Sequence, residues 1–362
     1  MPIPVIQTRL KLLFTNADLD VTTDIMPDML SFSYEDKETN EAEEINLVLK
    51  DPDGKWANKW QPNGGEVIKA YIMQGNIDEV TKTLYCGEFY VDELSVKVKP
   101  RTFEMKAVSI PLNKPIRRKL KTRAWEKTTL KAIASQIAAE AEISLLFDSE
   151  ENPTYDREEQ DRESDLKFLS RLCEDAGLSI KVTSRKLVIF NQAFYEKKKP
   201  IKTITVGNSN ILSGNFSASQ SETYKSCTIT YRDPKKKKAN EAAGHSLSDK
   251  KSSQPTQNSA VLTYTYVDPL ADENGQEYTM NERATSLEDA KRLAKAKLRK
   301  LNARKVTGSI SLVGDVSLVA GAVIKCQGFG VVDGNFIIET ANHTVSNVYT
   351  TSLTLRRVNT NY

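Results

Sequence analysis

The stretch Asp161-Arg-Glu-Ser-Asp-Leu-Lys-Phe-Leu-Ser-Arg-Leu-Cys-Glu-Asp-Ala-Gly-Leu178 predicts one short helix with clear signals at both ends. Ser164 is a favoured N-cap residue, and Asp165 places a negative charge at the positive end of the helix. Apolar residues then recur at helical spacing, at Leu166, Leu169, Leu172, Cys173 and Ala176. Gly177 tolerates the left-handed conformation that often follows a helix. We therefore expect a helix over residues 164–176.

The residues around this helix predict a small α+β domain over residues 112–200. A second helical stripe runs over residues 128–141, and the segment after Gly177 contains two short β-rich runs separated by a turn. These runs, 178–182 and 187–190, predict a hairpin.

Both flanks of this domain have β character. In the first flank, residues 1–111, the run 102–108 alternates apolar and polar residues as a half-buried strand does. The second flank, residues 201–362, is interrupted over 234–259 by Lys, Ser, Asn and Gln with almost nothing to bury, which predicts a mobile insertion. A third helix is expected over 286–302, capped by Ser286. No internal repeat is evident. The predicted order is β domain, α+β domain, β domain.

Composition argues against several function classes. The 51 basic and 48 acidic residues nearly cancel, so the net charge gives no general reason to expect nucleic acid or an anionic membrane as partner. The four cysteines are scattered without a CxxC pair, which favours reduced, buried thiols over disulfides or a zinc site. The N-terminus lacks the pattern of a signal peptide, and no apolar run is long enough for a membrane span. We expect no membrane anchor.

Candidate catalytic groups are few. His343 and His245 are the only histidines, no nucleophile elbow accompanies them, and we interpret His343 as a packed, hydrogen-bonded residue. The acidic run over 156–165 could supply the paired carboxylates of a glycosidase, but a solvated face or a helix entry explains it more simply. The glycines over 314–334 do not form a phosphate loop. We predict no catalytic, cofactor-binding or metal-binding residue.

Three stretches together resemble the late control protein D family, the central baseplate hub of contractile phage tails. The first is Phe32–Asp36 with Ile45–Asp51 and Trp60; the second is the capped helix; the third runs from Gly314 to Leu355. The family-signature residues that we expect to be structurally important are Asp51, Trp60, Arg162, Ser164, Asp165, Leu166, Phe168, Leu169, Gly177, Gly314, Asp315, Gly321, Gly334 and His343.

The resemblance implies a fold and a role. The fold is mainly β, with two tube-type antiparallel β-barrel domains, 1–111 and 201–362, flanking the α+β domain. The role is a homotrimeric symmetry adaptor around a central channel, joining a sixfold tail tube to a threefold spike. Implied partners are the tube or a tube initiator above, a separate spike protein below, and baseplate wedge proteins, with DNA or a tape-measure protein in the channel. Assembly would occur in the host cytoplasm, and the product would be part of a virion or tail-like particle.

Two alternatives stay open. One is a tail-associated peptidoglycan hydrolase, which would need a catalytic cleft. The other is the hub of a secretion-system spike, to which the family is similar. The sequence does not distinguish a phage from a bacteriocin-like particle or a secretion device.

Overall fold

A computed structural model describes residues 7–15, 19–39, 42–59, 65–76, 79–110, 116–183, 185–219, 223–232, 261–269, 275–284 and 286–359. Its helices and strands are β1 (Gln7–Phe14), β2 (Leu19–Asp20), α1 (Thr22–Ile25), β3 (Met29–Lys37), β4 (Glu44–Lys50), β5 (Val67–Gly75), β6 (Val80–Val98), β7 (Arg101–Val108), β8 (Leu120–Thr129), α2 (Leu130–Glu140), β9 (Ser144–Asp148), β10 (Thr154–Ser164), α3 (Asp165–Asp175), β11 (Ser179–Val182), β12 (Lys186–Phe190), α4 (Gln192–Glu196), β13 (Lys202–Thr205), β14 (Ile211–Ala218), β15 (Tyr224–Arg232), β16 (Val261–Val267), β17 (Gln276–Ala284), α6 (Leu287–Asn302), β18 (Val306–Val313), β19 (Val323–Gln327), β20 (Gly334–Val345) and β21 (Tyr349–Arg357). The predicted insertion 234–259 lies outside the described residues.

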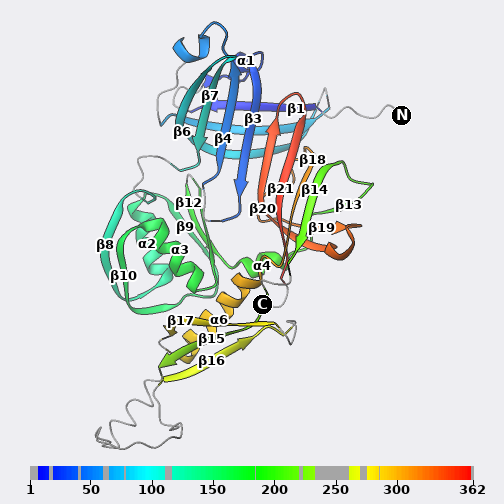
Figure 1. Ribbon diagram of the computed structural model, residues 1–362. Helices are drawn as coiled ribbons and strands as arrows, with labels where there is room; N and C mark the ends of the chain where they lie inside the picture. Colours follow the sequence, from blue (N-terminus) through cyan, green and yellow to red (C-terminus); the bar gives the residue numbers. More distant parts are fainter. Residues whose placement is uncertain are drawn as a thin grey trace, which may run out of the picture.

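One large sheet runs through both β-rich parts of the chain. Its 13 strands follow the path β14-β18-β21-β20-β3-β4-β7-β6-β5-β1-β2, with β19 beside β20 and β13 beside β19. The two parts meet where β20 pairs antiparallel with β3 (Figure 1). In this pairing Val345 lies opposite Phe32. We call this pairing the β3·β20 junction.

The mainly β fold with an α+β insert is confirmed. The prediction that each β domain is a β-barrel needs a correction. Among the described strands the pairing path stays open, with β14 at one end and β2 at the other. The reason lies in β20, which uses part of one edge to pair with β3 of the other half. The two halves are therefore open sheets joined edge to edge.

Strand alternation explains how the sheet buries its core. In β7, Phe103, Met105 and Ala107 point to the buried face, as the period-two pattern predicted. The same hydrophobic core includes Val345 and Tyr349 from the second half of the chain. The core thus continues across the β3·β20 junction.

The α+β unit, β8–β12 with α2–α4, has a core of its own. The α2 and α3 helices pack over its strands, and Thr129 and Ser164 cap them by accepting hydrogen bonds from the backbone. The hairpin expected after Gly177 is β11–β12, and β9 adds a parallel strand to it.

A separate helix–sheet unit consists of β15–β17 and α6. We expected the helix at 286–302 to belong to the second β domain. It packs instead on a three-stranded sheet (Figure 1). Ala290, Ala294 and Leu298 of the helix are buried in a core between the two. The reason is topological, because all four elements come between β14 and β18, which pair directly with each other.

Candidate functional site

Most family-signature residues of the capped helix, α3, pack it against the rest of the α+β unit. Phe168 and Leu169 are fully buried in the core of that unit, and Leu166 packs against its edge. Gly177 has φ +70°, and an added Cβ would lie 3.3 Å from Ala296 of α6. Glycine is therefore needed both for the turn and for the close approach of α6. Arg162 is exposed at a bulge of β10.

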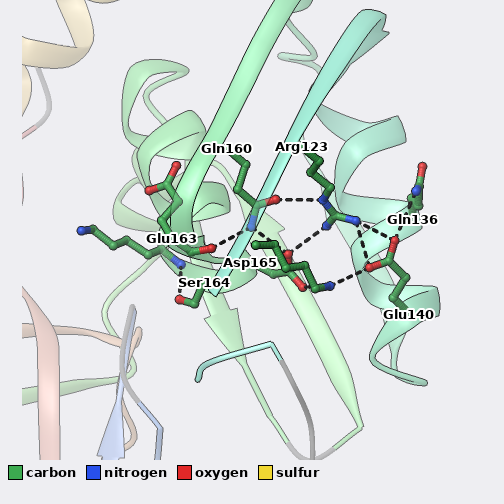
Figure 2. Close-up of polar contacts among 9 residues, drawn as sticks. Arg123, Gln136, Glu140, Gln160, Glu163, Ser164 and Asp165 are labelled. Atoms are coloured by element: carbon green, nitrogen blue, oxygen red, sulfur yellow. Dashed lines mark hydrogen bonds and ion pairs between the residues drawn. The ribbon is translucent and has the colours of Figure 1, made fainter. Parts of the chain in front are cut away.

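Asp165 is the centre of a buried polar cluster (Figure 2). Its side chain is 1% exposed and accepts bonds from Lys121 at 2.6 Å, Arg123 at 2.8 Å and Gln160 at 2.9 Å. The two cations also hold Glu140, each at 2.8 Å. The cluster thus ties α2 and α3 to β8 and β10.

The charges in this cluster are matched. Burial acts to raise the pKa of Glu140, but hydrogen bonds from Lys121, Arg123 and Gln136 outweigh it and lower that pKa to about 2. A carboxyl group with a lowered pKa is a poor proton donor, whereas a glycosidase needs an acid with a raised pKa. The geometry therefore fits a structural role for Glu140 and for Asp165, which shares its cations.

The remaining signature residues lie in the large sheet and its turns. Asp51 is 1% exposed and accepts a bond from the Trp56 backbone at 2.9 Å, which fixes the turn after β4. Trp60 lies outside the described residues. An added Cβ on Gly314 would lie 2.0 Å from the ring of Tyr349, so only glycine fits there. Asp315 accepts bonds from Ser317, and its pKa falls to about 2 because these bonds and that from Lys202 outweigh burial.

His343 lies in β20 at the β3·β20 junction and is packed and hydrogen-bonded, as predicted. It is 0% exposed and stacks on Tyr34 of β3, with the ring centroids 6.0 Å apart. Its Nε2 lies 3.0 Å from the Leu318 carbonyl, which can only accept, so Nε2 carries the proton. Nδ1 then accepts from Tyr349 Oη at 2.7 Å. Burial lowers the His343 pKa to about 4.

Two buried ion clusters that the sequence did not reveal attach the other units to the sheet. In the first, Lys181 of the α+β unit pairs with Asp36 at 3.0 Å and Glu43 at 2.7 Å, while Asp36 also accepts from the Ala320 backbone at 2.8 Å. Asp36 therefore links three parts of the chain. No local motif signals such contacts, because the partners are distant in sequence.

In the second cluster, Glu196 of α4 pairs with Arg356 of β21 at 2.8 Å and with Arg299 of α6 at 2.9 Å. Arg356 also pairs with Glu339 of β20 at 3.2 Å. Glu196 and Arg356 are both nearly inaccessible, at 2% and 3% exposed. Breaking such a buried pair leaves a charge without a partner, so this cluster fixes the helix–sheet unit to the sheet.

The two halves of the large sheet repeat one strand order. The first β unit is β3-β4-β7-β6-β5-β1 in space, and the second β unit is β14-β18-β21-β20-β19-β13. Each of these strands in the first β unit has a counterpart in the second. The two counterparts have the same position in the sheet and the same rank in the order of strands along the chain. One pairing differs in direction, because β13 is parallel to β19 whereas β1 is antiparallel to β5.

The register of the two units also matches. A bulge after Val91 of β6 corresponds to the bulge after Ile338 of β20. The Gly65 backbone donates to Val91 at 3.1 Å, and the Gly321 backbone donates to Ile338 at 2.8 Å. The pairing register of β3, β4, β6 and β7 therefore matches that of β14, β18, β20 and β21, and the start of β5 matches β19.

This register exposes a sequence repeat that the local patterns did not reveal. Gly65-Glu-Val-Ile-Lys69 corresponds to Gly321-Ala-Val-Ile-Lys325, and Gly87-Glu-Phe89 corresponds to Gly334-Asn-Phe336. All four glycines have positive φ, which explains why they recur. Met29-Leu-Ser31 likewise corresponds to Ile211-Leu-Ser213. The repeat is not evident from the sequence alone, because the matches are short and unevenly spaced.

Over β14, β18, β20 and β21, and over β3, β4, β7 and the end of β6, the face of the sheet opposite the core is mainly polar, with Val48 and Val313 as exceptions. In the second β unit its outward residues are Ser213, Asn215, Ser217, Thr307, Ser309, Ser311, Thr340, Asn342, Thr344, Thr350, Ser352 and Thr354. In the first β unit, Glu35, Glu44, Glu93 and Glu104 alternate with Lys37, Lys50, Lys97 and Lys106. These charges cancel, and Glu44–Lys106 pairs at 3.0 Å. We call this surface the polar face.

Two other carboxyl groups have raised pKa values. Burial raises the pKa of Glu38 and of Glu43 to about 7. They are only 5% and 7% exposed, and Glu43 pairs with Lys181. Each lines a hollow between units, but a general acid must reach its substrate, and the near-complete burial of both residues fits a structural role better.

The described residues offer no cluster of His, Cys, Asp or Glu able to hold a metal ion. All four cysteines are free and buried. No helix in the described part of the chain is long and apolar enough to cross a membrane.

Comparisons with known proteins agree on one group. A family described as phage tail baseplate hub (GPD) matches residues 111–349. The probable baseplate hub protein of Escherichia phage P2 is 28% identical over 225 residues, which are 60% of this chain and 55% of that protein. The match thus spans about half the length of that relative.

Solved structures share the fold. A 43 kDa tail protein from a Shewanella oneidensis prophage has a TM-score of 0.67 at 12% identity, over 97% of this chain and 98% of that one. A protein from E. coli, described as a component of the type VI secretion system, has a TM-score of 0.53 at 13% identity, over 92% of this chain and 75% of that one.

Proposed function

The chain belongs to the phage tail baseplate hub (GPD) family, and from this premise we propose that it is a structural hub that assembles as a homotrimer around a central channel. In this assembly the first and second β units of three chains alternate around a ring. Six similar units then face a sixfold tail tube, while the chain as a whole keeps the threefold symmetry of a spike.

The observation that carries this proposal is the duplication inside the sheet. A trimer meets a sixfold partner evenly only if each chain presents two similar faces. The two β units have the same strand order and register and are joined edge to edge by the β3·β20 junction. Residues 1–111 and 201–362 would then be the two tube-type domains, with 112–200 and the helix–sheet unit outside the ring.

The polar face is suited to line the channel. Hydroxyl and amide groups of the second β unit and cancelling charges of the first give a wet surface without net charge. Such a surface neither attracts nor repels a polyanion strongly. DNA or a tape-measure protein would therefore pass without being held.

The proposed partners follow from the ring. A tail tube or tube initiator would bind above, a separate spike protein below, and wedge proteins at the outside. The setting would be a virion or a tail-like particle assembled in the host cytoplasm. The similarity in fold to a type VI secretion component keeps a secretion device as the alternative setting.

Native mass spectrometry of the purified protein tests the oligomeric state, and electron microscopy tests the ring. We expect three copies and a ring with six similar lobes. A stable assembly of two, four or six equivalent chains would contradict the adaptor.

We also propose that the hub acts without catalysis. Four carboxylates of the acidic run, Glu158, Glu159, Glu163 and Asp165, are held by arginine or lysine side chains. We expect purified cell wall to stay turbid with the protein. Clearing of the wall that a single acidic substitution abolishes would establish the hydrolase instead.

A further inference from the structure

The β3·β20 junction shows how two β units join. Thr340 to Val345 of β20 pair with Lys37 to Phe32 of β3, and the Glu38 backbone donates to Glu339 at 2.9 Å. On the core side, His343 and Val345 are 0% and 5% exposed. The second β unit supplies the strand β20, and the first supplies its edge strand β3.

Each β unit also has a second strand edge, equivalent to the edge that the other unit uses in the β3·β20 junction. The counterpart of Thr340–Val345 is Glu93–Val98, the second part of β6, whose strand partner in the described structure is β7 alone. The counterpart of β3 is β14, which ends the strand path with β18 as its one described strand partner. One chain therefore has both strand edges that a second junction of this kind needs, one on β6 of the first β unit and one on β14 of the second.

Exposed apolar side chains on the second part of β6 indicate that this edge can bind another strand. Val96 corresponds to His343 and is 47% exposed, and Val98 corresponds to Val345 and is 76% exposed. Two apolar side chains on an unpaired strand edge promote association with another strand. β14 carries no charged residue, so its approach to Glu93 and Lys97 brings no like charges together.

We propose that β14 of one copy pairs antiparallel with Glu93–Val98 of β6 in the next copy, repeating the β3·β20 junction between chains. The pairing rests on the trimer proposed above and names the strands that close it. If the new strand pair has the same register as the β3·β20 junction, Ser95 lies opposite Ser217 of the neighbouring copy and Val96 lies opposite its Phe216. Because each copy supplies one edge of each kind, the contact is head-to-tail and generates a ring.

A disulfide at the predicted register provides the test. Glu38 and Glu339 form a hydrogen-bonded pair, so Glu35 and Asn342, three positions further, form a non-hydrogen-bonded pair with closer Cα atoms. Their counterparts are Ser217 and Ser95, both exposed. Within one chain β14 and β6 are seven strand spacings apart, roughly 34 Å, so a disulfide that joins positions 95 and 217 can form only between copies.

The full-length variant S95C/S217C should therefore give a covalent trimer on a non-reducing gel, reversed by dithiothreitol. The matched control S95C/S213C keeps the same strands, face and residue types but shifts the register by four residues, and it should stay monomeric on the gel. The native cysteines are buried and are shared by both variants.

A second variant tests the same contact without a thiol. V98K places a charge where the pairing buries an apolar side chain, so the concentration for half-assembly should rise about tenfold or more. The control V267K changes a valine that is 58% exposed in β16 of the helix–sheet unit, apart from both edges, and should leave assembly unchanged.

The outcomes separate this inference from the proposed function. The strand pairing would be overturned, and the trimer kept, if the protein has the mass of a trimer but forms no S95C/S217C bond. The same conclusion would follow if V98K and V267K weakened assembly equally. A protein that stays monomeric at the highest soluble concentration and forms no bond would overturn both.

Discussion

Protonation of His343 should weaken the fold at the β3·β20 junction. In the folded chain its pKa is about 4, because burial disfavours the charged ring, whereas the ordinary value is 6.5. Between these values the unfolded chain binds the proton and the folded chain does not. The stability that the neutral ring provides is therefore complete above pH 6.5 and is lost as the pH falls toward 4. The shift corresponds to about 3 kcal/mol.

The substitution His343→Gln isolates this contribution. Glutamine keeps a donor and an acceptor but does not titrate. Glu38 and Glu43 act in the opposite direction, because their raised pKa values give stability at low pH that is lost as the pH rises through about 7. Both proteins contain these glutamates, so their contribution cancels in the difference between wild type and variant.

Urea unfolding followed by tryptophan fluorescence provides the measurement, since Trp56 and Trp125 are buried. The destabilisation caused by His343→Gln should be largest at pH 6.5 and should shrink by about 3 kcal/mol at pH 4. His245→Gln serves as the comparison and should follow the wild-type profile. Parallel profiles of wild type and His343→Gln would refute the assignment of a depressed pKa to this ring.

Three substitutions test the packing. Leu169→Asp buries an unpaired carboxylate and should abolish soluble expression, whereas Lys167→Asp on the exposed face should not; equal solubility would contradict the packing of α3. Asp165→Asn leaves the two half-buried cations Lys121 and Arg123 with Glu140 as their one remaining acid in the cluster and should cost about 3 kcal/mol in urea unfolding, and a cost near zero would show that the cluster contributes little. Gly314→Ala forces the ring of Tyr349 to move and should cost about 1–3 kcal/mol by the same assay; an unchanged midpoint would show that the turn yields freely.

Local signals in the sequence predicted the local elements well. The cap at Ser164, the stripe through Leu169 and the alternation around Phe103 each depend on residues a few positions apart. Burial of His343 was also foreseeable, because a lone histidine among strand residues has no partner for catalysis. These features are fixed by helix and strand periodicity.

Contacts between distant segments could not be predicted in the same way. Lys181 is 145 residues from Asp36, and nothing near either residue indicates the other. The open sheet is a second example, since the pairing of β20 with β3 depends on how the two units meet. The repeat was visible in principle at Gly65 and Gly321, but it became significant only when the strand register aligned the two units.

The duplication also explains where the chain accepts additional structure. In the first β unit a short connection, residues 38–43, joins β3 to β4, whereas in the second unit the equivalent connection from β14 to β18 holds the entire helix–sheet unit. A surface loop tolerates a long insertion because the entropy of loop closure grows slowly with length. The insertion leaves the pairing of β14 with β18 intact. Arg299 of the insertion fixes it beside the sheet by pairing with Glu196, which also pairs with Arg356 of β21. One β unit can therefore carry an outer attachment while both keep the edges and the polar face that a ring requires.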